Sequence, residues 1–186
     1  MNFPRIFEIK TSRCRLRAPT EEDIPHVFSA TRFEGFNDGM LWDAPEREEE
    51  LRRPLEDGRK AWDEGRAYGF TIESLQSKKF IGRIGIRRTD EEDVWNIGFW
   101  THPRYQRRGY MTESVAAVLG FGFEELNAIR IEACHALWNI ASERVLKKSG
   151  MTFIRHIPKG FKKKDEWIEE NLLGISSNDW RKRKIE

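Results

Sequence analysis

Several features that mark large classes of protein are missing from this chain of 186 residues. It contains only two cysteines, Cys14 and Cys134, which are too few for a disulfide framework and show no metal-ligand spacing. No apolar run approaches the roughly 18 residues of a membrane span, and the start of the chain has no apolar signal segment. These absences predict a soluble, cytoplasmic protein that keeps its thiols reduced and uses no metal.

An excess of charge of one sign is also missing. The 33 basic and 31 acidic residues nearly cancel, so the composition gives no general argument for nucleic acid. Basic side chains cluster only locally, at 104–108, 162–164 and 181–184. A nucleic-acid surface would require the first two clusters to share one face, and we interpret the last two as solvated surface or tail. The sequence thus predicts neither a membrane nor a direct nucleic-acid partner.

Bulky apolar residues, in contrast, are abundant. Twelve Phe and seven Trp belong to a hydrophobic fraction of 38%, and a charged fraction of 34% supplies a polar surface. No internal repeat or low-complexity linker interrupts the chain. We therefore expect residues 1–186 to form a single domain, because this length can bury a substantial core.

The periodicity of the apolar residues predicts alternating strands and helices. Thr20, with Asp23 three residues later, predicts a helix start that continues to about Phe33. Pro54 is expected to bend or split the next helix, Glu46–Glu64. The other expected elements are strands at Cys14–Arg17, Tyr68–Ser74, Lys79–Arg87, Val94–Trp100, Arg130–Ala136, Thr152–Pro158 and Trp167–Ile175, and helices at Met111–Phe123 and Asn139–Ser149. This order predicts an α/β or α+β domain with one mixed sheet.

The most informative segment joins the strand that ends before Pro103 to the helix that begins at Met111. It reads Gln-Arg-Arg-Gly-Tyr-Met over residues 106–111. The first N–H groups of a helix have no partners within the helix and carry partial positive charge, and Gly109 lets a bulky anion approach the backbone. The segment therefore predicts a site for a pyrophosphate-bearing cofactor. The plain alternative is a basic surface turn before a buried helix.

Several segments together make the chain resemble a GNAT-superfamily N-acetyltransferase, in the branch of the Rim-type enzymes that acetylate N-termini of ribosomal proteins. These segments are Ile97–Trp100 with His102-Pro103, Gln106–Glu113, Ile131–Ala133, Asn139–Ser142 and Val145–Met151. The family pattern Gln/Arg-x-x-Gly-x-Gly/Ala is met at Gln106 and Gly109, with Met111 in place of the last small residue. The resemblance is close over about residues 94–153 and extends, through the order of elements, over most of the chain.

The resemblance implies a mixed, mostly antiparallel central sheet of about seven strands, flanked by four helices and splayed between strands 4 and 5. The cofactor core would span about residues 94–153, and the substrate-side elements about 20–65 and 154–175. Backbone N–H groups of the 107–111 turn would hold the pyrophosphate of acetyl-CoA, with help from side chains at 107, 108 and 112. The implied cofactor-binding residues are Phe99, Trp100, Thr101, Gln106, Arg107, Arg108, Gly109, Tyr110, Met111, Thr112, Asn139 and Ser142.

Within that set, the resemblance implies two kinds of contact with the pantetheine arm. The strand end at 99–101 would pair with the arm through backbone groups freed by the splay, while its aromatic side chains are expected to pack in the core. Asn139 would also reach the arm, and Ser142 the thioester sulfur, although helix capping alone explains both residues. Many family members carry a Tyr general acid where this chain has Leu146. We therefore assign the acid role to Ser142 or to a water that it holds.

The base that takes the proton of the amine is left open by the sequence. Relatives in the Rim-type branch carry a Glu between the last two strands, but an ungapped alignment from Gly150 places Phe161 there. The remaining candidates are Glu132, His135, Glu73 and Glu34. We predict Glu132 and His135, together with Ser142, as catalytic residues. Cys134 is not expected to act as a nucleophile, because no activating partner accompanies it.

The acceptor side is expected to include the 33–42 loop, the first two helices and the final hairpin around Pro158–Glu166. Phe36, Trp42 and Asp43 are predicted to bind the acceptor, and packing beneath the loop is the alternative for Trp42. The predicted function is direct acetyl transfer from acetyl-CoA to a primary amine, on a protein N-terminus or a small molecule. A catalytically silent acyl-CoA-binding sensor is the alternative, and a homodimer stays open.

Overall fold

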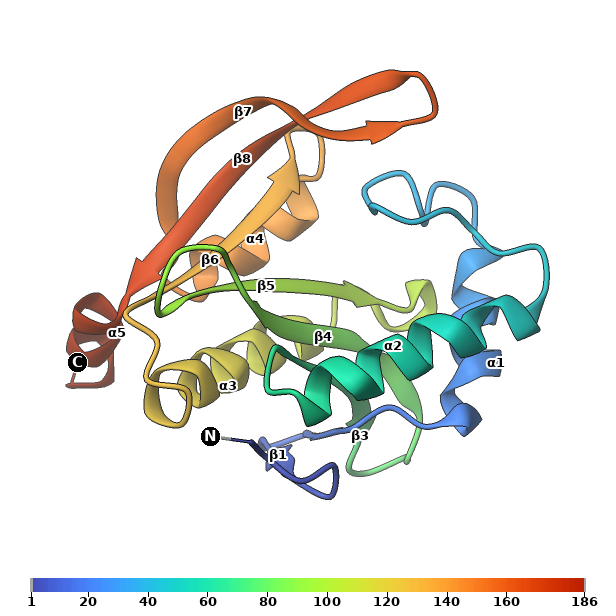
Figure 1. The fold of residues 1–186 in the computed structure, drawn as a ribbon, viewed down its shortest axis with the longest axis horizontal. Helices are drawn as coiled ribbons and strands as arrows, with labels where there is room; N and C mark the ends of the chain where they lie inside the picture. The colour runs from blue at the N-terminus through green and yellow to red at the C-terminus, as the bar shows by residue number, and fades with distance from the viewer. Residues whose placement is uncertain (1, 186) are drawn as a thin grey trace.

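The computed structural model describes residues 2–185, which form one eight-stranded sheet with helices on both faces (Figure 1). The strands are β1 (Glu8–Lys10), β2 (Cys14–Arg17), β3 (Ala67–Ser74), β4 (Phe80–Arg88), β5 (Val94–Thr101), β6 (Arg130–Ala136), β7 (Thr152–Lys163) and β8 (Glu166–Ser176). The α-helices are α1 (Ile24–Thr31), α2 (Arg52–Asp63), α3 (Tyr110–Glu124), α4 (Ile140–Lys148) and α5 (Ser177–Ile185). The strand order is β1-β2-β3-β4-β5-β6-β8-β7. Of the neighbouring pairs, β5 with β6 is parallel and the others are antiparallel, which confirms the predicted mixed sheet.

The core lies between the sheet and α3. Directly paired residues point to the same face of a sheet, so Tyr68, Ile86 and Ile97 form one row across β3, β4 and β5. This row is buried in one cluster with the inward side chains of α3, of which Val115 and Leu119 are 0% and 1% exposed. Each such buried side chain stabilises the fold by about 1.5–3 kcal/mol.

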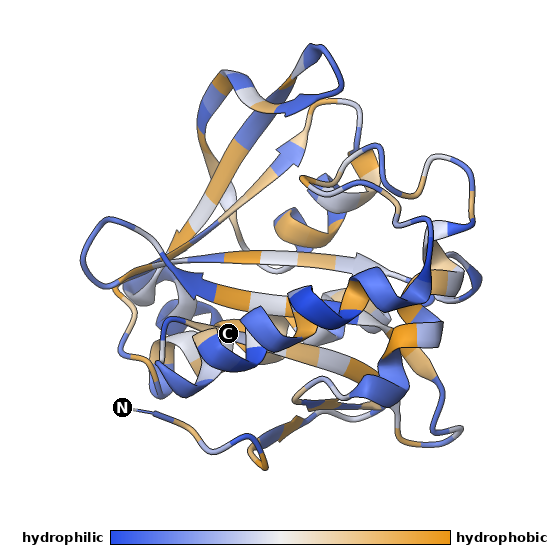
Figure 2. Cartoon of the chain, turned by 45° about the vertical axis from the view of Figure 1, so that its right-hand side comes forward, coloured by the Kyte–Doolittle hydropathy of each residue, from blue (hydrophilic) through white to orange (hydrophobic). Residues whose placement is uncertain are grey.

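Helix α2 covers the opposite face of the sheet with a narrow apolar stripe. Leu55 and Trp62 are its buried residues, and the rest of the helix is largely hydrophilic (Figure 2). The chain enters it through a 3-10 helix, Glu48–Leu51, and becomes α-helical at Arg52. Pro54 is tolerated two residues later because the first helical N–H groups lack internal partners in any case. The predicted bend or split at Pro54 is therefore not found, because α2 runs through Pro54 and the change of helix type lies before it, between Leu51 and Arg52.

Strands β5 and β6 separate after three residue pairs. Val94, Trp95 and Asn96 pair with residues 130–132, and β5 then continues beside β4 alone while β6 continues beside β8 (Figure 1). The facing edges, from Ile97 and from Ala133 onward, therefore have no strand partner. If the strands are counted from Cys14–Arg17, β5 and β6 are the fourth and fifth strands, so the predicted splay between these two strands is confirmed.

The structure adds to the prediction at both ends of the chain. Strand β1 was not predicted, because three residues are too few for an alternating pattern. Helix α5 occupies the expected basic tail, and its Trp180 packs against Phe123 with 5.2 Å between ring centroids. No helix within residues 2–185 is both long and apolar enough to cross a membrane.

The predicted final hairpin around Pro158–Glu166 is present, but its two strands are longer than predicted. Strand β7 continues through Pro158 to Lys163, and the turn to β8 is only two residues long. Pro158 lies where the β7–β8 register shifts, between Ile157 and Phe161. A proline fits there because β7 is an edge strand and the irregular ladder does not need its missing N–H.

Candidate active site

The turn before α3 presents unused backbone donors. Arg107 and Gly109 are left-handed, with φ of 61° and 78°. The N–H groups of Tyr110, Met111 and Thr112, which open α3, donate to no acceptor within residues 2–185. Helix N-termini also carry partial positive charge. This exposed row of donors fits a phosphate group, as the sequence predicts.

A clamp from the β1–β2 turn holds this site in place. The Arg13 side chain donates from Nη1 to the Arg108 carbonyl at 3.0 Å and from Nε to Glu113 Oε2 at 2.7 Å. The other oxygen of Glu113 accepts from the Arg13 backbone N–H and from the Ser12 hydroxyl, each at 2.9 Å. The Arg13 guanidinium also lies over the Tyr110 ring, 4.8 Å from its centroid. Two segments about 100 residues apart in the sequence therefore fix the start of α3.

The carboxylate of Glu113 is strongly stabilised in its ionised form. Burial by itself would raise the pKa of Glu113. Hydrogen bonds from the Thr11–Arg13 turn outweigh this effect and lower the pKa to about 2. Glu113 lies within the motif that carries the resemblance, yet nothing in the sequence shows its role. Arg13 lies so far from it in the chain that only the tertiary structure reveals the contact.

The open edge of β5 leads from this turn toward the interior. Phe99 packs against the core, whereas the Trp100 side chain points to the α2 face by strand alternation. There the Trp100 ring meets Phe36 at 5.2 Å and Phe80 at 5.7 Å, both measured between ring centroids. Thr101 accepts a bond from the Gln106 side chain at 3.4 Å. The expected core packing thus applies to Phe99, while Trp100 joins an aromatic group on the α2 side.

The start of α4 lies across the splay from β5. Asn139 caps the helix by accepting the Ser142 N–H at 3.1 Å, so the expected capping pair is present. The Ser142 hydroxyl makes no hydrogen bond with the described residues. Leu146 is fully buried in the core, which leaves no acid group at the position where many relatives carry Tyr.

The candidate bases differ in whether they have a proton-accepting atom that is free of hydrogen bonds. Glu132 belongs to the last residue pair before the splay, and Arg130 donates to its Oε1 at 2.7 Å, while its Oε2 takes no hydrogen bond from residues 2–185. His135 donates from Nδ1 to the Ala136 carbonyl at 2.9 Å, and its Nε2 is enclosed without a partner. Glu73 is ion-paired with Arg17 at 3.3 Å.

Two further groups take structural positions. His102 is buried, with Nε2 2.9 Å from the Ser29 hydroxyl, and burial together with Arg104 lowers its pKa. Burial, with help from Glu170 and Glu132, raises the pKa of Cys134 to about 11. At neutral pH the Cys134 thiol is therefore protonated, in agreement with the expectation that it is no nucleophile.

The loop between α1 and α2 reaches across the splay. Phe36 and Trp42 lie together, with ring centroids 6.4 Å apart, and Phe36 also contacts Trp100. A Cβ added at Gly39 would lie 3.1 Å from the Trp138 ring and 3.3 Å from the Asn139 amide. The loop thus touches the segment that precedes α4, and it joins the two arms of the splay from the α2 side.

The tip of the β7–β8 hairpin fastens this loop. Lys163 donates from Nζ to the Met40 and Trp42 carbonyls at 3.2 and 3.0 Å, and it pairs with Asp43 at 2.7 Å. Figure 1 shows the hairpin tip above the loop on one side of the molecule. Lys163 was not among the predicted residues, because a contact over some 120 residues has no sequence signal. The Asp43 side chain is 87% exposed, and the ion pair with Lys163 is the contact that holds it.

Comparisons with known proteins point to one family. Residues 13–152 match the acetyltransferase (GNAT) domain. The N-acetyltransferase YnaD of Bacillus subtilis (strain 168) is 38% identical over 104 residues, which are 54% of this chain and 59% of that protein. An acetyltransferase of the GNAT family from Bacillus anthracis superposes with a TM-score of 0.83 at 24% identity, over 92% of this chain and 99% of that one. RimJ of Mycobacterium smegmatis, solved with a CoA-disulfide, superposes with a TM-score of 0.82 at 19% identity, over 96% and 91% of the two chains.

Proposed function

The chain belongs to the GNAT acetyltransferase family, and from this membership we propose that it transfers the acetyl group of acetyl-CoA directly to a primary amine. The family match and the relatives named as N-acetyltransferases support this activity. The observation that carries the proposal is the continuous path from the free N–H groups at 110–112, along the open edge of β5, to the aromatic residues under the α1–α2 loop.

In this proposal the cofactor is held mainly by main-chain atoms. The 107–112 turn binds the pyrophosphate, with Gly109 allowing the close approach. The edge of β5 from Phe99 to Thr101 pairs with the pantetheine arm as an added strand would. Asn139 lies at the start of α4, from which it can reach the same arm, and Ser142 keeps a free hydroxyl for the departing thiolate.

Glu132 is our choice for the group that takes the proton of the amine. It lies where β5 and β6 part, and its Oε2 is not used by any described neighbour. In this proposal His135 takes no part in proton transfer, because its Nε2 is enclosed within the protein. Much of the rate then comes from holding the amine and the thioester in attack geometry.

Thiol release from acetyl-CoA, followed with a panel of amines and short peptides, tests the activity. We expect Glu132→Gln to lower kcat by about 10²-fold or more, a usual size for a lost general base. His135→Gln serves as the matched control, with kcat within a few-fold of the parent. Equal kcat values for Glu132→Gln and the parent would reject Glu132 as the base.

A cofactor-binding module without turnover is the second candidate. Leu146 at the usual Tyr position and the pairing of Glu132 with Arg130 favour it. Tight acetyl-CoA binding in calorimetry without thiol release, for any acceptor of the panel, would support this candidate. The nature of the acceptor, a cytoplasmic location and a homodimer stay predictions.

A further inference from the structure

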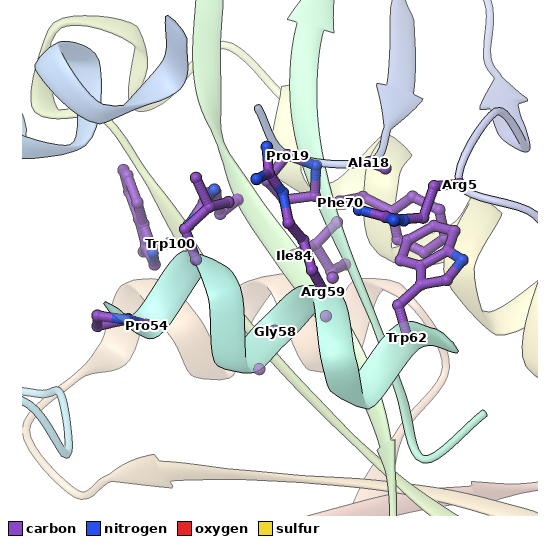
Figure 3. Close-up of a pocket in the computed structure, with 15 residues that line it drawn as sticks. Arg5, Ala18, Pro19, Pro54, Gly58, Arg59, Trp62, Phe70, Ile84 and Trp100 are labelled. Atoms are coloured by element: carbon purple, nitrogen blue, oxygen red, sulfur yellow. The ribbon is translucent and has the colours of Figure 1, made fainter. Parts of the chain in front are cut away.

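A hollow of about 240 Å³ lies between α2 and the sheet (Figure 3). Its floor includes Gly98 and Trp100 of β5, and Leu55, Gly58 and Trp62 come from α2. Gly98 is solvent-exposed although it lies in the middle of the sheet, so water reaches the floor of the hollow. The lining is mainly apolar, as in most small-molecule sites.

The hollow exists because four glycines face it. Gly69, Gly85 and Gly98 are paired in register across β3, β4 and β5, and Gly58 lies on the α2 side. A Cβ added at Gly58, Gly69 or Gly98 would meet nothing within 4 Å. None of the four has a positive φ. Neither a turn nor crowding requires glycine at these positions, although glycine weakens helices and strands. What these residues provide is space.

An arginine without an acidic partner borders this space. Arg83 is partly buried, its Nε is enclosed without a hydrogen bond, and it forms no ion pair with any residue from 2 to 185. Arg59 and Arg5, which also line the hollow, pair with Glu21 and Asp63. A desolvated cation without a partner is costly.

The carboxylates near Arg83 are already in use. Asp23 accepts two bonds from the Arg17 guanidinium, at 2.8 and 3.0 Å, and further bonds from Thr20 and Thr71. Glu73 is also bound to Arg17. Burial lowers the pKa of Arg83, and the nearby charge of Asp23 opposes this effect in part. The hollow therefore has an apolar body and, at Arg83, a positive charge with no ion pair among residues 2–185.

We propose that this hollow binds the acceptor, and that the acceptor is an amine of amino-acid size that carries an apolar group and a carboxylate directed to Arg83. The proposal rests on the transferase function proposed above. At Gly98 and Trp100 one edge of β5 pairs with β4, and the edge that faces β6 is open at the splay. These two residues also line the hollow, so the hollow adjoins the proposed reaction site. Its volume lies below the roughly 300–1,000 Å³ of drug-sized sites, which fits one small molecule and not a folded peptide segment. Arginine and carboxylate pair through two parallel hydrogen bonds.

Binding without turnover is the first test. The probes are 3-phenylpropanoate and 3-phenylpropan-1-ol, which share the apolar body and differ in charge. In calorimetry we expect the carboxylate to bind the parent protein at least tenfold more tightly than the alcohol, and Arg83→Met to abolish this preference. Arg83→Met should fold at least as well as the parent, because it removes an unpaired charge. Equal binding of the two probes, or no binding of either, would overturn the inference.

The glycines allow a second test that separates ligand binding from folding. Gly58→Ala should raise the melting temperature, since alanine favours the helix, and should weaken 3-phenylpropanoate binding several-fold. Gly120→Ala is the matched control. It lies on α3, where its Cβ would make ordinary contacts at 3.7 and 3.8 Å, and it should leave probe binding unchanged. Undiminished binding in Gly58→Ala would show that the hollow is not the site.

Turnover tests the acceptor role separately. We expect kcat/KM for L-phenylalanine to exceed that for 2-phenylethylamine at least tenfold, and Arg83→Met to remove the difference. Acetyl transfer to both amines with no preference would refute the carboxylate assignment and leave the proposed function intact. Binding of 3-phenylpropanoate without thiol release from acetyl-CoA, for these or any other amines, would instead reject the transferase function and, with it, the acceptor role of the hollow.

Discussion

Gly109 decides how closely an anion can approach the start of α3. Its φ of 78° places it in the left-handed region, where L-residues are strained by roughly 1–2 kcal/mol. A Cβ at this position would lie 3.3 Å from Arg13 Nη2, which belongs to the clamp. A side chain here would disturb both the free donors and the arginine that supports them.

We expect Gly109→Val to weaken acetyl-CoA binding at least tenfold while the protein still folds. The backbone strain costs little of the total stability, but the close approach of the diphosphate is lost. Isothermal titration calorimetry measures the effect. Gly35→Val is the control, because φ there is also positive, at 72°, and the residue lies outside the turn. An unchanged dissociation constant in Gly109→Val would contradict the assigned cofactor site.

Asn139 has two roles that a single substitution can separate. Asn139→Ala removes the cap to Ser142 and should cost only about 1 kcal/mol of unfolding free energy. The proposed contact with the pantetheine arm should make the loss of turnover larger, about tenfold or more. Urea unfolding and steady-state kinetics on the same preparation provide the comparison. A stability loss with an unaltered kcat would reduce Asn139 to a helix cap.

At the scale of elements, the β1–β2 turn and α3 are joined through one carboxylate. The folded-state pKa of Glu113, about 2, lies below its ordinary value of 4.5. The contribution of ionised Glu113 to the stability of the folded protein is therefore complete above about pH 5 and is lost as the pH falls toward about 2. The full shift corresponds to roughly 3 kcal/mol, which solvent screening reduces to about 1–2 kcal/mol.

Glu113→Gln should accordingly lower the unfolding free energy by about 1–2 kcal/mol at pH 7 and by much less near pH 3. It should also weaken acetyl-CoA binding, because the Arg13 clamp on the turn is lost. Urea unfolding at a series of pH values measures the first effect. Glu56→Gln is the control, since Glu56 is exposed on α2 and forms no ion pair within residues 2–185. The same stability loss at pH 7 and pH 3 would argue against an electrostatic clamp.

At the scale of the whole molecule, Lys163 joins the hairpin tip to the α1–α2 loop on the side where we propose that the acceptor binds. Lys163→Met removes the bonds to Met40, Trp42 and Asp43. We expect KM for the acceptor to rise about tenfold while acetyl-CoA affinity stays within twofold, because the 107–112 turn lies outside these contacts. Lys162→Met is the matched control, since its side chain is 53% exposed and its one ion pair within the described residues is with Asp165, at 3.9 Å. An equal effect of the two substitutions would remove the special role of Lys163.

The sequence by itself determined most of the elements and pointed to the turn that we propose for the cofactor. Thr20 with Asp23, Asn139 and Gly109 act through the local backbone, so their effects can be read from their neighbours in the chain. The apolar periodicity of 111–123 defined α3 for the same reason. The splay and the family followed from the resemblance of residues 94–153, and the structure and the comparisons confirm both.

Only the tertiary structure decided which distant residues meet. The clamp of Arg13 on Glu113, the tether of Lys163 and the row of Gly69, Gly85 and Gly98 each depend on contacts between remote segments or on strand register. Burial sets their chemistry, because it determines which charges have an ion-pair partner and which, like Arg83, have none among the described residues. No local pattern encodes these distances, since they arise when the sheet assembles.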